Sequence, residues 1–225
     1  SDDPSEPDTP SDDPSDPSEP DTPSEKHWVE ENGNWYYTDD SGDRVTGKQT
    51  IDGKDYYFDE TGLMQTDWIF DNGWYYANSD GALQKGWLKT TDGNAVEGGC
   101  WYKLDSETGL LQTGWIYWNN YWYYLRPDFG GATAMGLVKI QDGNSTEGGL
   151  HYYLRPELDG ALLEEGWVYL DGEWYYAKSD WTGGMAQNEW VLLDAWYCFD
   201  ENSKMLKNTT TPDGYYVDEN GRWVS

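Results

Sequence analysis

The chain has 225 residues, and 17% of them are aromatic, although all hydrophobic residues together reach only 36%. This composition excludes an ordinary aliphatic core, and it excludes disorder throughout, because disordered chains are poor in aromatic residues. The formal net charge of -29 excludes a nucleic-acid-binding protein, which needs a basic surface.

Residues 1–25 differ from the rest of the chain in composition. They hold ten acidic residues, no basic residue and seven of the ten prolines, and the heptapeptide Ser-Glu-Pro-Asp-Thr-Pro-Ser occurs in them twice. Proline prevents helix and sheet, and like charges repel one another, so this segment is predicted to be a disordered acidic Pro/Ser linker. All the aromatic residues and all 26 glycines lie in residues 26–225, which are predicted to fold.

No stretch is apolar and long enough to span a membrane, so no membrane insertion is expected. The chain begins at Ser1 without a methionine. We therefore expect a longer protein, whose upstream part would carry a signal peptide or a catalytic domain.

From residue 27 onward the sequence repeats a pattern of about 20 residues. Each repeat opens with Gly-Trp or a variant, continues with an aromatic triplet such as Trp35-Tyr36-Tyr37, and ends with a polar turn and a small apolar pair such as Leu63-Met64. Two repeats, 86–113 and 136–165, are longer because each carries an insertion that runs from Asp-Gly-Asn to Glu-Gly-Gly. Nine repeats start near His27, Gly47, Asp67, Gly86, Gly114, Gly136, Gly166, Asn188 and Asn208.

Each repeat is predicted to form one β-hairpin. In the run from Trp167 to Tyr176, Asp171-Gly172 separates two stretches of aromatic and aliphatic residues, which is a strong hairpin signal. A single hairpin is marginally stable in water, whereas stacked hairpins can share a core. The predicted fold is therefore an all-β solenoid of nine stacked β-hairpin repeats over residues 26–225.

The pattern Gly-Trp-x-x-x-x-Gly-x-Trp-Tyr-Tyr resembles the cell-wall-binding repeat family. That family includes the choline-binding modules of Gram-positive surface proteins, the glucan-binding repeats of glucansucrases and the repeats of clostridial toxins. The resemblance covers about residues 27–225. It implies a secreted or cell-wall-associated module that binds choline or a choline-decorated teichoic acid and has no catalytic residue, cofactor or metal of its own.

The resemblance also implies where the ligand binds. In choline-binding modules the cage takes the Trp of Gly-Trp, the first ring of the triplet and the third ring of the next triplet, because ring faces attract a quaternary ammonium through cation–π interaction. Carried over to this sequence, the pattern is complete at four places: Trp28, Trp35 and Tyr57; Trp87, Trp101 and Tyr124; Trp115, Trp122 and Tyr153; Trp190, Trp196 and Tyr216.

Other repeats depart from this pattern. Lys103 and Cys198 replace third rings, Lys48 and Asp55 replace both tryptophans of one repeat, and another repeat has Leu137 and His151. We expect at least two silent interfaces. Strand alternation sends the middle ring of each triplet to the other face, so these rings are predicted to be core: Tyr36, Tyr75, Tyr123 and Tyr175.

Two alternatives remain open at this point. The same rings could stack on the sugars of a glucan or a host glycan, and the two insertions could then close over a saccharide. The array could also be a structural or protein-interaction spacer that binds no small ligand.

Enzyme activity is not expected, because no catalytic motif is present and the carboxylates fall in turns, where Asp serves the backbone. Calcium at Asp39, Asp40 and Asp43 is a weak option, since the spacing is not that of an EF-hand. No disulfide between Cys100 and Cys198 is predicted. Some modules of this family pair through their terminal repeats, so the last repeat, with Tyr215, Tyr216 and Trp223, is a candidate for a homodimer contact or for simple capping.

Overall fold

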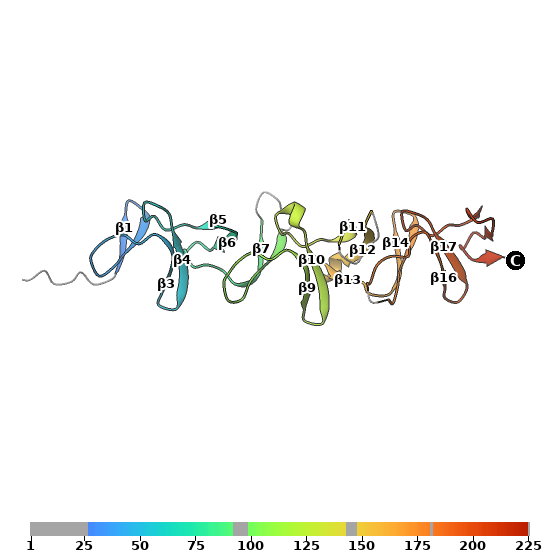
Figure 1. The fold of residues 1–225 in the computed structure, drawn as a ribbon, viewed down its shortest axis with the longest axis horizontal. Helices are drawn as coiled ribbons and strands as arrows, with labels where there is room; N and C mark the ends of the chain where they lie inside the picture. The colour runs from blue at the N-terminus through green and yellow to red at the C-terminus, as the bar shows by residue number, and fades with distance from the viewer. Residues whose placement is uncertain (1–26, 92–98, 143–147, 181, 225) are drawn as a thin grey trace, which may run out of the picture. The chain divides into compact units, whose positions relative to one another are not determined.

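The computed structural model describes residues 27–91, 99–142, 148–180 and 182–224 (Figure 1). The predicted linker 1–25 and the central parts of both insertions, 92–98 and 143–147, lie outside the described residues.

The described residues form nine small antiparallel sheets, one for each predicted repeat, which confirms an all-β array of hairpins. Figure 1 draws the strands of these hairpins as arrows. Seven sheets are two-stranded, and those of the sixth and ninth repeats have a third strand. The strands are β1 (His27–Glu31), β2 (Asn34–Thr38), β3 (Gly47–Ile51), β4 (Lys54–Phe58), β5 (Asp67–Phe70), β6 (Trp74–Ala77), β7 (Gly86–Thr90), β8 (Cys100–Leu104), β9 (Gly114–Trp118), β10 (Tyr121–Leu125), β11 (Gly136–Ile140), β12 (Leu150–Arg155), β13 (Ala161–Leu162), β14 (Gly166–Leu170), β15 (Glu173–Ala177), β16 (Glu189–Leu192), β17 (Trp196–Phe199), β18 (Thr209–Thr210), β19 (Tyr216–Val217) and β20 (Trp223–Val224).

The tight turns of the hairpins need two consecutive residues with positive φ. In the β14–β15 hairpin these are Asp171 (φ 51°) and Gly172 (φ 87°), and Asn32 (φ 53°) and Gly33 (φ 82°) do the same between β1 and β2. This is the type I′ geometry, whose twist matches that of the flanking strands. The Asn-Gly and Asp-Gly pairs therefore set the hairpins where the sequence predicts them.

A link follows each hairpin and makes a further antiparallel bridge to its second strand. Phe58 pairs with Met64 in this way, and Phe199 pairs with Met205. Two single-turn 3₁₀ helices, η1 (Pro127–Phe129) and η2 (Pro156–Leu158), lie in links that begin with Arg-Pro. The hydrophobic pattern did not predict them, because three residues are too few to show a helical period.

The chain divides into two compact units, and each has its own buried residues. In the first, which comprises the described residues up to Asp67 together with Ser79–Ala82, Phe58 is completely buried beside Ile51 and Tyr56. In the second, which comprises Trp68–Asn78 and the described residues from Leu83 onward, Tyr102, Tyr152 and Leu154 are buried.

The predicted core position of the middle triplet ring agrees with this burial. Tyr36, Tyr123 and Tyr175 are buried, and Tyr75 is half-buried. Among the described residues, no helix is long and apolar enough to cross a membrane.

Candidate functional site

Two tryptophans meet on one face of each complete hairpin. In β14–β15, Trp167 lies opposite Tyr176, and Trp174 is two residues before Tyr176 on the same strand. The two tryptophans are therefore diagonal neighbours on one face, which brings large side chains into contact. Strand register alone therefore brings the Trp of Gly-Trp next to the Trp that begins the aromatic triplet.

The two rings of a pair meet nearly at a right angle. Their centroids are 6.0 to 6.4 Å apart, and their planes are 79° to 89° apart, in four pairs: Trp28–Trp35, Trp68–Trp74, Trp87–Trp101 and Trp167–Trp174. Trp115–Trp122 and Trp190–Trp196 occupy the same register positions in their hairpins. We call each such pair an aromatic corner.

The two rings of a corner differ in exposure. The second ring is exposed in five of the six corners, for example by 41% at Trp35 and by 39% at Trp122, whereas Trp101 is half-buried. The first ring is half-buried in most corners, and Trp115 packs against Tyr124 of its own hairpin (5.1 Å) and Tyr152 of the next (5.0 Å). One ring is therefore fixed by the core, while the other presents its face to solvent.

A backbone hydrogen bond from a link brings an aliphatic side chain to the corner. The N–H of Met64 donates to the carbonyl of Trp35 (2.8 Å), and the N–H of Met205 donates to that of Trp174 at the same distance. Leu111 makes the same bond to Trp74. The sequence predicts the small apolar residue of each link, but its place beside the preceding corner becomes visible only in the structure.

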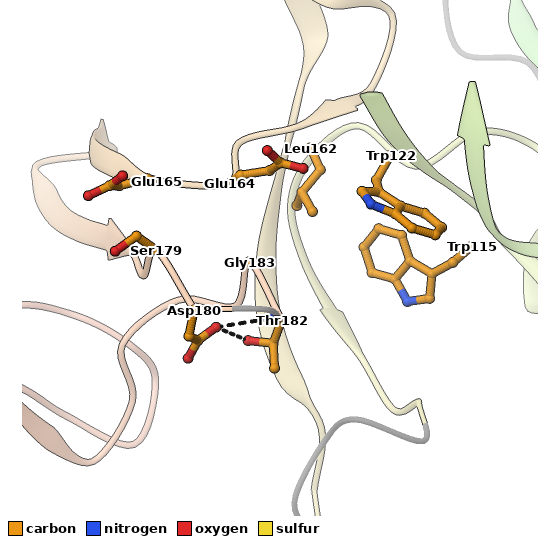
Figure 2. A pocket seen from close by; sticks show the side chains of 9 residues that line it. All are labelled: Trp115, Trp122, Leu162, Glu164, Glu165, Ser179, Asp180, Thr182 and Gly183. Atoms are coloured by element: carbon orange, nitrogen blue, oxygen red, sulfur yellow. Dashed lines mark hydrogen bonds between the residues drawn. The ribbon is translucent and has the colours of Figure 1, made fainter. Parts of the chain in front are cut away.

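The corner of β9–β10 opens into a cavity of about 520 Å³. In Figure 2 the rings of Trp115 and Trp122 lie on one side of it, and the link residues Leu162 and Glu164 extend toward them. Glu165 and Asp180 line the opposite side, and no basic residue is among the described residues that line the cavity.

Carboxylates hold some of the indole rings of the corners. The Nε1 of Trp115 donates to Asp142 (2.7 Å), and that of Trp190 donates to Asp213 (2.9 Å). Hydrogen bonds from the Thr211 hydroxyl and then from Trp190 lower the pKa of Asp213, so it stays charged beside the ring. Each bond fixes the orientation of an indole and places a negative charge near its edge.

The corner of β16–β17 borders a cavity of about 380 Å³ lined by Trp190, Trp196, Asp213, Tyr215 and Trp223. Tyr215 stands nearly perpendicular to both Trp190 (84°) and Trp223 (86°). From the sequence, Tyr215 and Trp223 were expected only as residues of a terminal repeat that pairs or caps, and not as part of a ligand site. Trp223 nevertheless bridges β19 from the position that Met205 holds in the previous link. That equivalence is the signal that could have found it.

The predicted third rings make contacts of their own within the described residues. Tyr216 is outside the lining of this cavity, and its hydroxyl donates to Asn208 (2.7 Å). Tyr124 packs on Trp115 of its own hairpin, and Tyr153 packs against the core cluster around Tyr175. Tyr57 is half-buried opposite Lys48 on β3.

The corner of β14–β15 borders a cavity of about 480 Å³ lined by Trp167, Tyr169, Trp174, Tyr197, Met205 and Lys207, with Glu219 and Asn220. The amine of Lys207 donates to the carbonyl of Gly172 (3.1 Å). As in the β9–β10 cavity, two tryptophans and an aliphatic link residue line this cavity. The two cavities differ in the residue two positions after the aliphatic one, which is Lys207 here and Glu164 in the β9–β10 cavity.

Three repeats of the described residues lack a Trp pair, namely those of β3–β4, β11–β12 and β18–β20. In β3–β4 the ammonium of Lys48 lies 3.7 Å from the carboxylate of Asp55, so an ion pair takes the place of the two rings. In β11–β12 the Nδ1 of His151 lies 3.2 Å from the hydroxyl of Ser203, which is completely buried. Burial, followed by the charge of Lys139, lowers the pKa of His151.

Cys100 and Cys198 are both buried and form no disulfide with each other, and burial raises the pKa of the Cys198 thiol. The described residues contain no cluster of three or more His, Cys, Asp or Glu side chains suited to a metal ion. Around Asp39, the carboxylate instead accepts the backbone N–H groups of Ser41 and Asp43.

Family models match several parts of the chain. Models described as choline-binding repeats match residues 184–223 and 45–76, and a model described as a cell wall binding repeat matches residues 28–43, 113–128 and 165–180. No curated protein sequence matches the chain.

Solved structures from Streptococcus pneumoniae are similar over most of the chain. The choline-binding domain of CbpL is 32% identical, with a TM-score of 0.55, and the match covers 88% of this chain and 96% of that domain. Choline-binding protein F, crystallised in the presence of a peptidoglycan analogue, is 33% identical with a TM-score of 0.59. That match covers 89% of this chain but 58% of choline-binding protein F. The modular autolysin LytC, 22% identical over 88% of this chain and 41% of its own, shares the fold with a TM-score of 0.60.

Proposed function

The chain belongs to the choline-binding repeat family, and we propose that it is a non-catalytic targeting module that binds choline on a cell-wall polymer. Each open corner would hold the trimethylammonium group of one choline. The polymer would be a choline-bearing teichoic acid or glycan at the surface of a Gram-positive cell.

The right-angled pair of tryptophans is the observation that carries this proposal. A quaternary ammonium cannot donate a hydrogen bond, so aromatic faces take the place of its water shell. Two perpendicular rings offer one face and one edge-on wall to a rounded cation, and the aliphatic side chain of the link adds a third wall. The exposed second ring leaves the corner accessible from solvent.

Charge favours a cationic ligand at the most enclosed of these sites. The charged residues that line the β9–β10 cavity are all acidic: Glu164, Glu165 and Asp180. Negative charge around a partly enclosed site attracts cations and repels anions. We therefore propose Trp115 and Trp122 as ligand-binding residues, with Tyr153 of the next hairpin as their predicted third ring.

The same role is proposed for the corner of Trp28 and Trp35, with Tyr57, and for the corner of Trp190 and Trp196. At the latter, Tyr215 and Trp223 line the cavity and join Tyr216 as candidate walls. The polymer bears many cholines, so several weak corners on one chain bind it more tightly than one corner could.

A neutral glycan is the second candidate ligand, and one observation favours it. Phe70, Tyr117 and Tyr169 are exposed by 57% to 66% and stack at a tilt on the second tryptophan of their corners. Such exposed ring pairs are wide enough to contact the face of a sugar. The choline proposal has the stronger support, because the corner is a rounded recess and not an extended platform.

Retention on a tertiary-amine resin, which resembles choline, tests the proposal. The folded chain should bind the resin and elute with free choline but not with the same concentration of sodium chloride. A folded chain that passes through the resin and binds an immobilised glucan would replace the choline proposal by the glycan one.

A further inference from the structure

The corner of β7–β8 carries its own cations. The ammonium of Lys103 lies over the ring of Trp87, 5.7 Å from its centroid, and that of Lys89 lies over the ring of Trp101 at 5.5 Å. Both distances are within the range of cation–π attraction. Strand register places all four side chains on one face, because Trp87 is opposite Lys103 and Lys89 is opposite Trp101.

Both lysines stand where other hairpins have aromatic rings. The residue opposite the first tryptophan is Tyr124 in β9–β10 and Tyr176 in β14–β15, each 5.1 Å from that tryptophan. The position of Lys89 is likewise held by aromatic residues in those hairpins, namely Tyr117 at 5.1 Å from Trp122 and Tyr169 at 4.9 Å from Trp174. The lysines of β7–β8 therefore cover the faces that aromatic residues cover elsewhere.

Carboxylates and aromatic rings also surround this corner. Asp159 accepts a hydrogen bond from the Nε1 of Trp101 (3.0 Å), and Lys103 acts electrostatically on Asp105. On its other side Trp87 packs against Trp118 (5.6 Å) and Tyr123 (5.2 Å). Its ring is thus enclosed by aromatic side chains and one ammonium group.

We infer that Lys89 and Lys103 occupy the ring faces of the β7–β8 corner and exclude a cationic ligand from it. This inference rests on the proposed function. It makes the two lysines specificity-determining residues. It also means that Trp87, Trp101 and Tyr124, which the sequence pattern predicts to form a binding site like the three other complete sets of rings, do not bind a cation. The β7–β8 corner then binds no choline although it contains both tryptophans, because the ammonium groups of Lys89 and Lys103 already cover its rings.

Substitution of both lysines tests this inference through the number of cholines bound. The double variant Lys89→Tyr/Lys103→Tyr gives β7–β8 the same four rings as β9–β10 and β14–β15. The variant Lys89→Met/Lys103→Met removes only the charges, and Lys89→Arg/Lys103→Arg is the matched control that keeps them. Calorimetric titration with choline should give one more equivalent for the Tyr and Met variants than for the unchanged chain and the Arg variant.

Several outcomes would overturn the inference. One is that the Met and Tyr variants, folded by circular dichroism, bind the same number of equivalents as the unchanged chain. Another concerns Lys103, which also takes the third-ring position predicted for the corner of Trp68 and Trp74. When Trp101→Ala is added to the Tyr variant, the additional equivalent of bound choline should disappear. If it disappears with Trp74→Ala instead, the additional choline binds at the corner of Trp68 and Trp74, and the inference about β7–β8 is wrong. If the unchanged folded chain binds no choline, the proposed function itself fails, which is a distinguishable result.

Discussion

At the scale of single residues, the two tryptophans of one corner differ in what surrounds them. Trp115 is half-buried, donates a hydrogen bond to Asp142 and packs on two tyrosines, whereas Trp122 exposes 39% of its surface. The first ring therefore supports the fold as well as the corner, and the second mainly serves the ligand.

This difference predicts separable effects of mutation. Trp122→Ala should remove one equivalent of bound choline and change the free energy of unfolding by roughly 0.5 kcal/mol, as surface substitutions do. Trp115→Ala should remove the same equivalent and lower the free energy of unfolding by roughly 3 kcal/mol, because it leaves a cavity and removes the hydrogen bond from the indole to Asp142. Calorimetry and urea denaturation measure the two quantities, and equal stability losses in the two variants would contradict the assignment.

Glu164 is the acidic residue that the link presents to the β9–β10 corner. Glu164→Lys should weaken choline binding at this one corner by roughly tenfold, which corresponds to about 1.4 kcal/mol of unfavourable charge interaction at close range. Glu164→Gln is the control, and it should cause a smaller loss. Unchanged affinity in the lysine variant would mean that Glu164 does not face the ligand.

Residues of the corners were predictable from sequence where they belong to one hairpin. Trp115 and Trp122 meet because of strand register, which the Gly-Trp and triplet spacing specifies. Glu164, Tyr215 and Trp223 were not predicted to line corners, because they reach the corners from later parts of the chain. Their positions depend on how consecutive repeats stack, and no local pattern encodes that.

At the scale of elements, the links stack closely on one another. A Cβ atom added to Gly160, which has a φ of 93°, would lie 2.6 Å from the carbonyl oxygen of Ala134 in the preceding link. Glycine is thus required twice at this position, by its backbone conformation and by the close contact.

Substitution of link glycines should reveal both requirements. Gly160→Ala should lower the free energy of unfolding by roughly 3 kcal/mol, because the left-handed conformation and the contact each cost about 1 to 2 kcal/mol. Gly114→Ala, at a φ of 85° with no atom within 4 Å of the added Cβ, should cost only about 1 kcal/mol. Urea denaturation compares the two, and equal losses would show that the contact adds nothing.

Aspartates hold the turns at the start of the links. Asp59 accepts a hydrogen bond from the Thr61 hydroxyl and from the backbone N–H groups of Leu63 and Thr61, and these bonds lower its pKa. Backbone and hydroxyl hydrogen bonds from Thr108 lower the pKa of Asp105 in the same way. The carboxylates in these turns therefore have a structural role, as the sequence analysis expected.

A lowered pKa in the folded state makes stability depend on pH. The unfolded carboxylate takes up a proton near pH 3.8, while the folded one resists it, so the stabilisation is complete above that pH and is lost as the pH falls through the lower folded pKa. Unfolding curves measured between pH 6 and about 2.5 should show this loss. Asp59→Asn should be less stable at pH 6 and lose less on acidification, and an identical pH dependence in both proteins would refute the role of Asp59.

The hairpins were largely predictable, because Asn-Gly and Asp-Gly turns recur at a regular spacing. One departure shows where the sequence was insufficient. Ser203 has a φ of 64° at a turn position that glycine fills in other links, and its hydroxyl lies beside His151, which stands where other hairpins have a tryptophan. The two exceptions are 52 residues apart and form one contact, which only the structure reveals.

At the scale of the whole molecule, an array of corners turns a weak contact into a targeting device. Each corner is a small site, and repetition along the chain allows several to engage one polymer. The formal charge of -29 adds a general attraction for cations, but ten of the acidic residues belong to the segment 1–25, which lies outside the described residues. Selectivity must therefore come from the rings, the nearby carboxylates and the lysines that close β7–β8.

The most direct measurement compares choline with its neutral carbon isostere, 3,3-dimethyl-1-butanol, by calorimetric titration of the folded chain. The two molecules have nearly the same shape, so the comparison isolates the charge that the aromatic faces and carboxylates would recognise. The account predicts saturable binding of choline, at least tenfold weaker binding of the isostere, and loss of choline binding when Trp35, Trp122 and Trp196 are replaced together by alanine. Equal affinity for both molecules, or no choline binding by the folded chain, would contradict it.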